Sequence, residues 1–192
     1  MSKIFYIDVE TTGVDSSKHA MVQFSGIIEI DGQEKERVDI LTSPFPGDLV
    51  SKEALEVIGK TIDQLREYPD AKESYRQLLD VTGKYVDKFN RADKFYFIGY
   101  NSRFDEDFVR AWFRKCNDNY FGSWFYWPTI DVSNLAAIHF MQNGGRPDSF
   151  KLMSVAAALG IEVDEDLAHD AMYDIIITKK IFETLTHNGE TL

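Results

Sequence analysis

A short apolar run that ends in two carboxylates constrains the fold of this chain more than any other feature. Residues 4–10 read Ile-Phe-Tyr-Ile-Asp-Val-Glu, and an apolar run of this length is typical of a buried strand. Side chains two residues apart point to the same face of a strand, so Asp8 and Glu10 project together. Because an unpaired carboxylate is costly to remove from water, such a pair usually binds a cation. The pattern predicts a strand over residues 3–9 with a candidate cation site at its C-terminal end.

Further strand and helix patterns alternate along the rest of the chain. Residues 20–31 and 34–42 are expected to form a hairpin, because Asp31-Gly32 is a strong hairpin-turn signal. Residues 95–98 are another short apolar run, which ends at Gly99. Helices are expected over residues 51–58, from 61, and over 71–90, 104–116, 131–141, 151–159 and 170–185. This order predicts an α/β domain with one mixed sheet and a ligand crevice at the C-terminal strand ends.

Composition and charge narrow the class of protein. A chain of 192 residues, 44% of them apolar, suits one domain with a full core. The net charge of −11 argues against nucleic-acid binding through a basic surface, unless acidic clusters bind Mg²⁺, which cancels two charges per ion. Cys116 is the only cysteine, which excludes an internal disulfide and favours a reducing compartment. Without a signal-peptide pattern or a long apolar run, we expect a cytosolic protein of bacterial or phage type.

Two more acidic residues and a histidine extend the predicted cation site. Asp105 follows the apolar run at residues 95–98, so it also lies near the C-terminal end of a predicted strand. His169 and Asp174 are five residues apart, which on one helix would place them roughly 140° apart around the axis. The expected geometry therefore has Asp174 on the inner face of the last helix and His169 in the loop before it. Asp170 is the expected N-cap of that helix.

Three segments resemble, in chain order, the motifs of the DEDDh, or DnaQ-like, 3′→5′ exonuclease superfamily. They are Asp8-Val9-Glu10-Thr11-Thr12-Gly13, Gly99-Tyr100-Asn101 through Phe104-Asp105, and His169-Asp170-Ala171 through Asp174. The likeness is greatest to the exonuclease domains of the DNA polymerase III epsilon subunit and of exodeoxyribonuclease I. Tyr100 and Ser102 stand where the family more often has His and Ala, and neither change removes a ligand. The resemblance implies a ribonuclease H-like fold, with a central mixed five-stranded sheet flanked by helices, in a single exonuclease domain over residues 1–192.

The resemblance also implies the cofactors and the catalytic roles. Two Mg²⁺ or Mn²⁺ ions would be bound by four carboxylates: Asp8, Glu10, Asp105 and Asp174. Within that pattern Asp8 bridges the ions, Glu10 and Asp174 complete one coordination sphere, and Asp105 acts mainly through water. Hard divalent ions prefer such oxygen ligands, and a pair of them can activate water and stabilise a leaving 3′ oxygen. His169 takes the proton from the attacking water, which suits an imidazole that titrates near neutral pH.

Substrate contacts are expected from residues beside these motifs. The resemblance places the backbone near Thr11 and Thr12 against the terminal 3′-hydroxyl, with Asn101 and Phe104 shaping the pocket. Arg103 is a candidate for contact with backbone phosphates. The other candidates for phosphate contact are Arg110, Arg114, Lys115, Arg146 and Lys151. A solvated helix face explains these basic residues equally well. The aromatic residues at 120–127 could stack on bases, but core packing is the preferred interpretation.

These residues predict a metal-dependent 3′→5′ exonuclease that releases nucleoside 5′-monophosphates from single-stranded or frayed DNA ends. A 3′→5′ exoribonuclease acting on short RNA or RNA 3′ tails is the nearest alternative, because no contact to a 2′-hydroxyl is readable. A non-catalytic metal-binding module and a metal-independent carboxylate hydrolase are further alternatives. The expected partner is nucleic acid with a free 3′ end, DNA in preference to RNA. A polymerase, or a replication or repair complex, is the candidate protein partner, and no membrane is expected.

Overall fold

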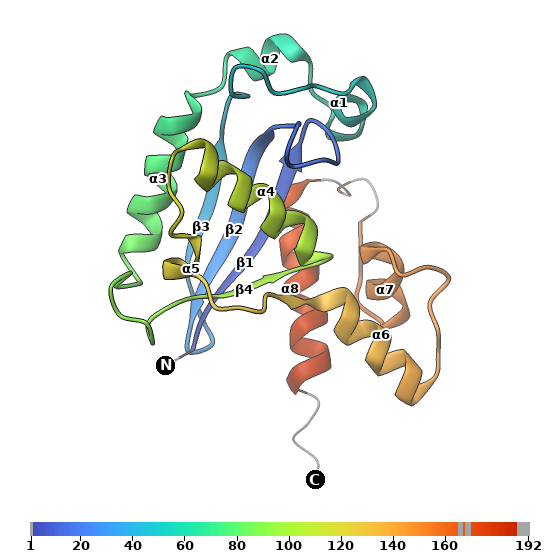
Figure 1. Cartoon of the computed structure of the whole chain (residues 1–192). Coiled ribbons are helices and arrows are strands. Elements are labelled where there is room, and N and C mark those ends of the chain that lie inside the picture. The colour runs from blue at the N-terminus through green and yellow to red at the C-terminus, as the bar shows by residue number, and fades with distance from the viewer. Residues whose placement is uncertain (1, 165–166, 168–169, 188–192) are drawn as a thin grey trace.

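A five-stranded mixed sheet forms the centre of the computed structural model, which describes residues 2–164, 167 and 170–187 (Figure 1). The strands lie in the order β3-β2-β1-β4-β5, with β1 antiparallel to β2 and parallel to β4. Their bounds are β1 Lys3–Thr11, β2 Met21–Ile30, β3 Gln33–Leu41, β4 Tyr96–Gly99 and β5 Ile130–Asp131. Asp31 and Gly32 both have positive φ, as the turn of the β2–β3 hairpin requires. The predicted α/β fold with a mixed five-stranded sheet is confirmed.

Helices cover both faces of this sheet. Their bounds are α1 Lys52–Ile58, α2 Ile62–Arg66, α3 Ala71–Gly83, α4 Ser102–Lys115, α5 Phe121–Trp124, α6 Val132–Asn143, α7 Leu152–Ala158 and α8 Ala171–His187. In Figure 1, α3 and α4 lie on one side of the sheet and α8 lies on the other. No helix among the described residues is long and apolar enough to cross a membrane.

Alternation along β1 divides its side chains between two cores. Phe5, Ile7 and Val9 belong to the core beneath α3 and α4. Tyr6 belongs to the opposite core, where it packs with Ile175 and other residues of α8. Because side chains two apart share a face, Asp8 and Glu10 follow Tyr6 and project toward α8. The fold thus directs both carboxylates toward the helix that carries Asp174.

Two local expectations differ from the structure. The helix predicted over residues 71–90 ends at Gly83, so its last turns are wrong. Beyond it, the side chains of Asp87 and Asn90 accept hydrogen bonds from backbone N–H groups two residues ahead, and these Asx turns replace helical bonds. Phe89, expected on the apolar face of that helix, is 86% exposed.

The aromatic segment at 120–127 contains the short helix α5, which was not predicted. Phe121, Trp124 and Phe125 are buried in the core beneath α3 and α4, so core packing is confirmed for these three side chains. Tyr120 and Trp127 are exposed. The segment therefore serves mainly to close one end of the core.

Candidate active site

Strand β1 supplies two of the carboxylates at the C-terminal edge of the sheet. The register between β1 and β2 shifts between Glu10 and Thr11, directly after the Asp8–Glu10 pair. Both carboxylates are half-buried. Since β4 is parallel to β1, the C-terminal end of β4 lies at the same edge.

Asp105 reaches the same edge from the first turn of α4. Asn101 adopts a left-handed conformation, with φ of 60°, at the corner between β4 and α4. Asp105 is only 3% exposed, and its Oδ1 accepts a hydrogen bond of 3.2 Å from the backbone N–H of Val9. A Cβ at Gly99 would lie 3.3 Å from Asp105 Oδ2 and 3.1 Å from the carbonyl oxygen of Ile7. The glycine therefore lets this carboxylate approach the end of β1.

Asp174 approaches from the other face, in the first turn of α8. Its backbone N–H donates to the carbonyl oxygen of Asp170 at 2.9 Å, and the Asp170 side chain accepts from the N–H of Tyr173 at 2.9 Å. The expected N-cap at Asp170 is thus confirmed. The Oδ1 atom of Asp174 is buried, and α8 packs against β1. Asp174 therefore lies on the inner face of its helix, as the spacing predicted.

Mutual repulsion shows that the four carboxylates form one electrostatic cluster. Burial, followed by the charges of Asp105, Glu10 and Asp174, raises the pKa of Asp8 well above its ordinary value. Burial and the charges of Asp174 and Asp170 raise the pKa of Glu10 to about 7, against the opposing effect of Lys60.

Asp105 shares this behaviour, and a fifth carboxylate contributes to it. Burial raises the pKa of Asp105, although its hydrogen bond from Val9 favours the charged form. The charges of Asp131 and Glu10 raise it further. Asp131 itself caps α6 by accepting from the N–H of Ser133, and it also accepts from the N–H of Asn101. Its predicted role as an N-cap is confirmed.

A divalent cation fits this donor set. Buried or half-buried carboxylates raise one another's pKa here, and a bound divalent ion would supply positive charge that offsets their repulsion. In the described part of the chain, no group of three or more His, Cys, Asp or Glu side chains is arranged to hold an ion by itself. Mg²⁺ does not require such a cage, because it usually takes one or two carboxylates together with water and substrate phosphates.

Of the remaining predicted site residues, the structure describes all except His169. His169 lies outside the described residues, so its role stays a prediction. The Thr11 hydroxyl donates to the carbonyl oxygen of Gly13. The Thr12 hydroxyl donates to the carbonyl oxygen of Leu49, and its N–H donates to that of Ala20. Both threonines are buried, and their hydrogen bonds fix the backbone conformation after Glu10.

Around α4, Asn101 is exposed and Phe104 is half-buried against Phe108, with 4.9 Å between ring centroids. Arg103 pairs with Asp107 at 3.1 Å, and Arg110 pairs with Glu106 at 2.6 Å. Two of the basic residues predicted to contact phosphates are thus engaged by carboxylates of their own helix.

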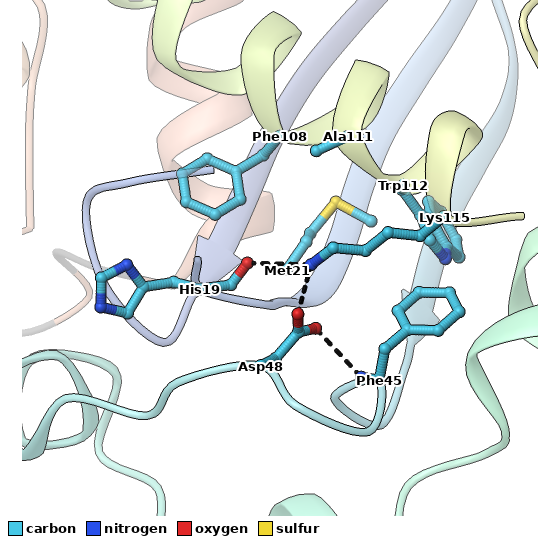
Figure 2. A pocket seen from close by; sticks show the side chains of 8 residues that line it. All are labelled: His19, Met21, Phe45, Asp48, Phe108, Ala111, Trp112 and Lys115. Carbon is cyan, nitrogen blue, oxygen red and sulfur yellow. Dashed lines mark hydrogen bonds and ion pairs between the residues drawn. The ribbon is translucent and has the colours of Figure 1, made fainter. Parts of the chain in front are cut away.

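Lys115, another predicted phosphate contact, points into a small pocket between α4 and the loop that precedes α1 (Figure 2). Its ammonium pairs with Asp48 at 2.5 Å and donates to the carbonyl oxygen of His19 at 3.3 Å. It also lies over the ring of Phe45. These contacts hold the loop against α4, and the ion pair neutralises the charge of Lys115.

Two residues beside the site were given no role by sequence reasoning. Lys60 carries the positive charge that lowers the pKa of Glu10, yet it belongs to none of the three motifs. The Tyr100 hydroxyl donates to the carbonyl oxygen of Phe150 at 2.8 Å and joins the β4–α4 corner to the segment before α7. Only the departure from the family pattern at Tyr100 could have indicated the second contact.

Comparison with known proteins agrees with this geometry. Residues 5–182 match the RNase T family, which is described as exonuclease. Ribonuclease T of Hahella chejuensis is 29% identical over 97% of this chain and 84% of its own length. Ribonuclease T of Buchnera aphidicola subsp. Baizongia pistaciae is 26% identical over the same shares.

Solved structures of E. coli exonuclease I share the fold. The zinc-bound complex with single-stranded DNA superposes with a TM-score of 0.80 at 21% identity, covering all of this chain. A complex with a dT13 oligonucleotide gives 0.76, also at 21% identity. The chain spans only 42% of the exonuclease I chain. The predicted ribonuclease H-like fold is therefore confirmed, and the match over residues 5–182 shows that the chain belongs to the RNase T exonuclease family of the DEDD superfamily.

Proposed function

We propose that this exonuclease removes nucleotides from single-stranded 3′ ends with two divalent metal ions, Mg²⁺ or Mn²⁺, and that residues 1–192 act as a single catalytic domain. The observation that carries the proposal is the electrostatic cluster of Asp8, Glu10, Asp105 and Asp174, which three separate elements bring to one edge of the sheet. When bound, divalent ions would supply an activated water and stabilisation of the leaving oxygen.

The chain's own residues would divide the remaining work. Asp8 and Glu10 lie on the face toward α8, and Asp105 lies in the first turn of α4, so ligands would approach the substrate phosphate from both sides of β1. His169 is the proposed general base, accepting a proton from water. In support, His169-Asp170-Ala171 through Asp174 resembles the third motif of the superfamily.

The polymer is proposed to be RNA, with release of nucleoside 5′-monophosphates. Support comes from the relatives named ribonuclease T, which this chain matches over 84% of their length. DNA, the polymer favoured by sequence reasoning, is the second candidate, because structures of exonuclease I with single-stranded DNA share the fold. A cytosolic location and a replication or repair partner stay predictions.

Degradation of end-labelled polymers tests both the proposed exonuclease reaction and the choice of polymer. Single- and double-stranded DNA and RNA, labelled at the 3′ or the 5′ end, are incubated with Mg²⁺, Mn²⁺ or EDTA. We expect mononucleotides from the 3′ end of single strands, faster from RNA, with no turnover in EDTA. His169→Ala should lose nearly all turnover while His139→Ala, which changes a histidine of α6 outside the site, should retain it. Intact substrates with metal across neutral pH would refute the proposal, and faster loss of DNA would reverse the choice of polymer.

A further inference from the structure

The position of α8 along the sheet decides where Asp174 lies, because this carboxylate belongs to the first turn of that helix. One turn of an α-helix rises about 5.4 Å. A slide of α8 by one turn would carry Asp174 well beyond the roughly 2 Å at which a carboxylate oxygen binds Mg²⁺. The candidate active site therefore depends on contacts that fix α8 along its own axis.

Apolar packing alone distinguishes such positions of α8 poorly. The buried residues of this helix include Ile175, Ile177 and Ile181, which all belong to the core between α8 and the sheet. Ile177 and Ile181 are four residues apart, so a slide by one turn would put one isoleucine where the other now packs. Burial of apolar surface is also non-directional. A directional contact between α8 and the sheet would remove this ambiguity.

Lys179 makes a directional contact of this kind. Its ammonium pairs with Glu29 of β2 at 2.5 Å and lies 5.6 Å from the centre of the Tyr6 ring on β1. Glu29 stands opposite Ile4 in the β1–β2 register, and Tyr6 follows Ile4 by two residues, so both partners lie on one face of the sheet. A single side chain of α8 is thus tied to two strands at once.

The ion pair is largely withdrawn from solvent, which makes its separation costly. The side chains of Lys179 and Glu29 are 18% and 9% exposed. Pulling such a pair apart leaves an uncompensated charge in the interior, and a defined registry is the best-attested use of buried ion pairs. Glu183 lies 3.7 Å from the same ammonium, but it is on α8 and would move with it. The contact with Glu29 is therefore the one that opposes a slide of the helix.

We propose that Lys179 and Glu29 are positioning residues that lock α8 at the register which sets Asp174 beside the carboxylates of β1, an inference that rests on the proposed function. Lys179 follows Asp174 by five residues, about 7.5 Å along the helix axis. On the sheet, Tyr6 precedes Asp8 by two residues and shares its face. The lysine thus fixes α8 close to the turn that carries Asp174.

Replacement of the pair by two methionines tests the inference. Glu29→Met/Lys179→Met keeps unbranched side chains and the same net charge, and exchange of a buried ion pair for apolar groups is often tolerated. Binding of Mn²⁺ alone, measured by isothermal titration calorimetry, should weaken roughly 10-fold in this variant. With excess Mn²⁺, kcat for a single-stranded oligonucleotide should fall by a similar factor. Lys179→Arg keeps the ion pair and should retain wild-type values of both.

The ion pair between Lys84 and Glu36 is the matched control. It joins the end of α3 to β3 at 2.8 Å, and α3 lies on the opposite side of the sheet from α8 (Figure 1). Glu36→Met/Lys84→Met also removes one charge of each sign, and it should leave Mn²⁺ binding and kcat unchanged. An equal loss in this control, or wild-type Mn²⁺ affinity in folded Glu29→Met/Lys179→Met, would overturn the inference.

Urea unfolding establishes that each variant folds. Should the double methionine variant not fold, Glu29→Gln, which keeps the shape of the side chain without its charge, takes its place in the same comparison. Wild-type Mn²⁺ affinity in Glu29→Gln would then overturn the inference.

Calorimetry of the wild type separates this inference from the proposed function. Wild-type protein that binds Mn²⁺ but degrades no polymer, with weaker binding in Glu29→Met/Lys179→Met, would refute only the proposed function. Wild-type protein that binds no Mn²⁺ would refute both.

Discussion

Replacing Glu10 with Gln should stabilise the metal-free protein at alkaline pH, because the native fold holds this carboxylate near others of like charge. Burial and the charges of Asp174 and Asp170 raise the pKa of Glu10 from 4.5 to about 7. The native state therefore binds a proton more tightly than the unfolded chain, so the stability that Glu10 contributes is fully present below pH 4.5. It is lost as pH rises through 7.

The size of the effect follows from that rise in pKa. At 1.36 kcal/mol for each pH unit, the charged Glu10 lowers the free energy of unfolding by about 3 kcal/mol above pH 8. Gln has nearly the same shape and no charge, so Glu10→Gln should recover up to about 3 kcal/mol at pH 8 and almost nothing at pH 4. The variant should also have lost exonuclease activity. A gain in stability coupled to a loss of activity is expected where a functional site holds unfavourable charge.

Urea unfolding in EDTA at several pH values measures this difference. Glu56→Gln is the matched control, because Glu56 is exposed on α1, and it should change stability by less than about 0.5 kcal/mol. Adding Mg²⁺ should narrow the gap between the wild type and Glu10→Gln, because an ion that binds only the native state stabilises it by mass action. Equal stability of both proteins at pH 8 would refute the electrostatic reasoning. A gain at pH 4 as large as that at pH 8 would assign the effect to packing or hydrogen bonding instead.

Two further substitutions separate the placement of the site from the stability of the fold. Gly99→Ala adds a methyl group 3.3 Å from Asp105 Oδ2. Because the methyl group would move that carboxylate, kcat should fall roughly 10- to 100-fold. An unchanged kcat would contradict the close approach of Gly99 and Asp105. Leu78→Ala, at a fully buried position in the core beneath α3 and outside the three motifs, should cost about 2–5 kcal/mol in urea unfolding. Turnover per folded molecule should stay the same in Leu78→Ala, and a selective loss of kcat would place α3 in the active site.

The Asp8–Glu10 pair could be predicted from the sequence because it depends on short-range geometry, whereas its grouping with Asp105 and Asp174 was implied by the resemblance to a known family. Alternation along β1 places Asp8 and Glu10 on one face, and the spacing between His169 and Asp174 indicates the inner face of α8. The end of α3 could not be predicted in the same way. An apolar periodicity continues to Phe89, but the side chains of Asp87 and Asn90 bond to nearby N–H groups and form turns. Such side-chain hydrogen bonds compete with helix formation, and the apolar periodicity of a sequence does not reveal this competition.

The basic side chains show a second limit of prediction from sequence. Two ion pairs of α4, Arg103–Asp107 and Glu106–Arg110, join residues four apart, so the sequence spacing could have indicated that these arginines are paired within the helix. The pairing of Lys115 with Asp48 crosses 67 residues and depends on the tertiary fold. In a chain with net charge −11, a basic residue is informative about substrate binding only after its acidic partners have been found.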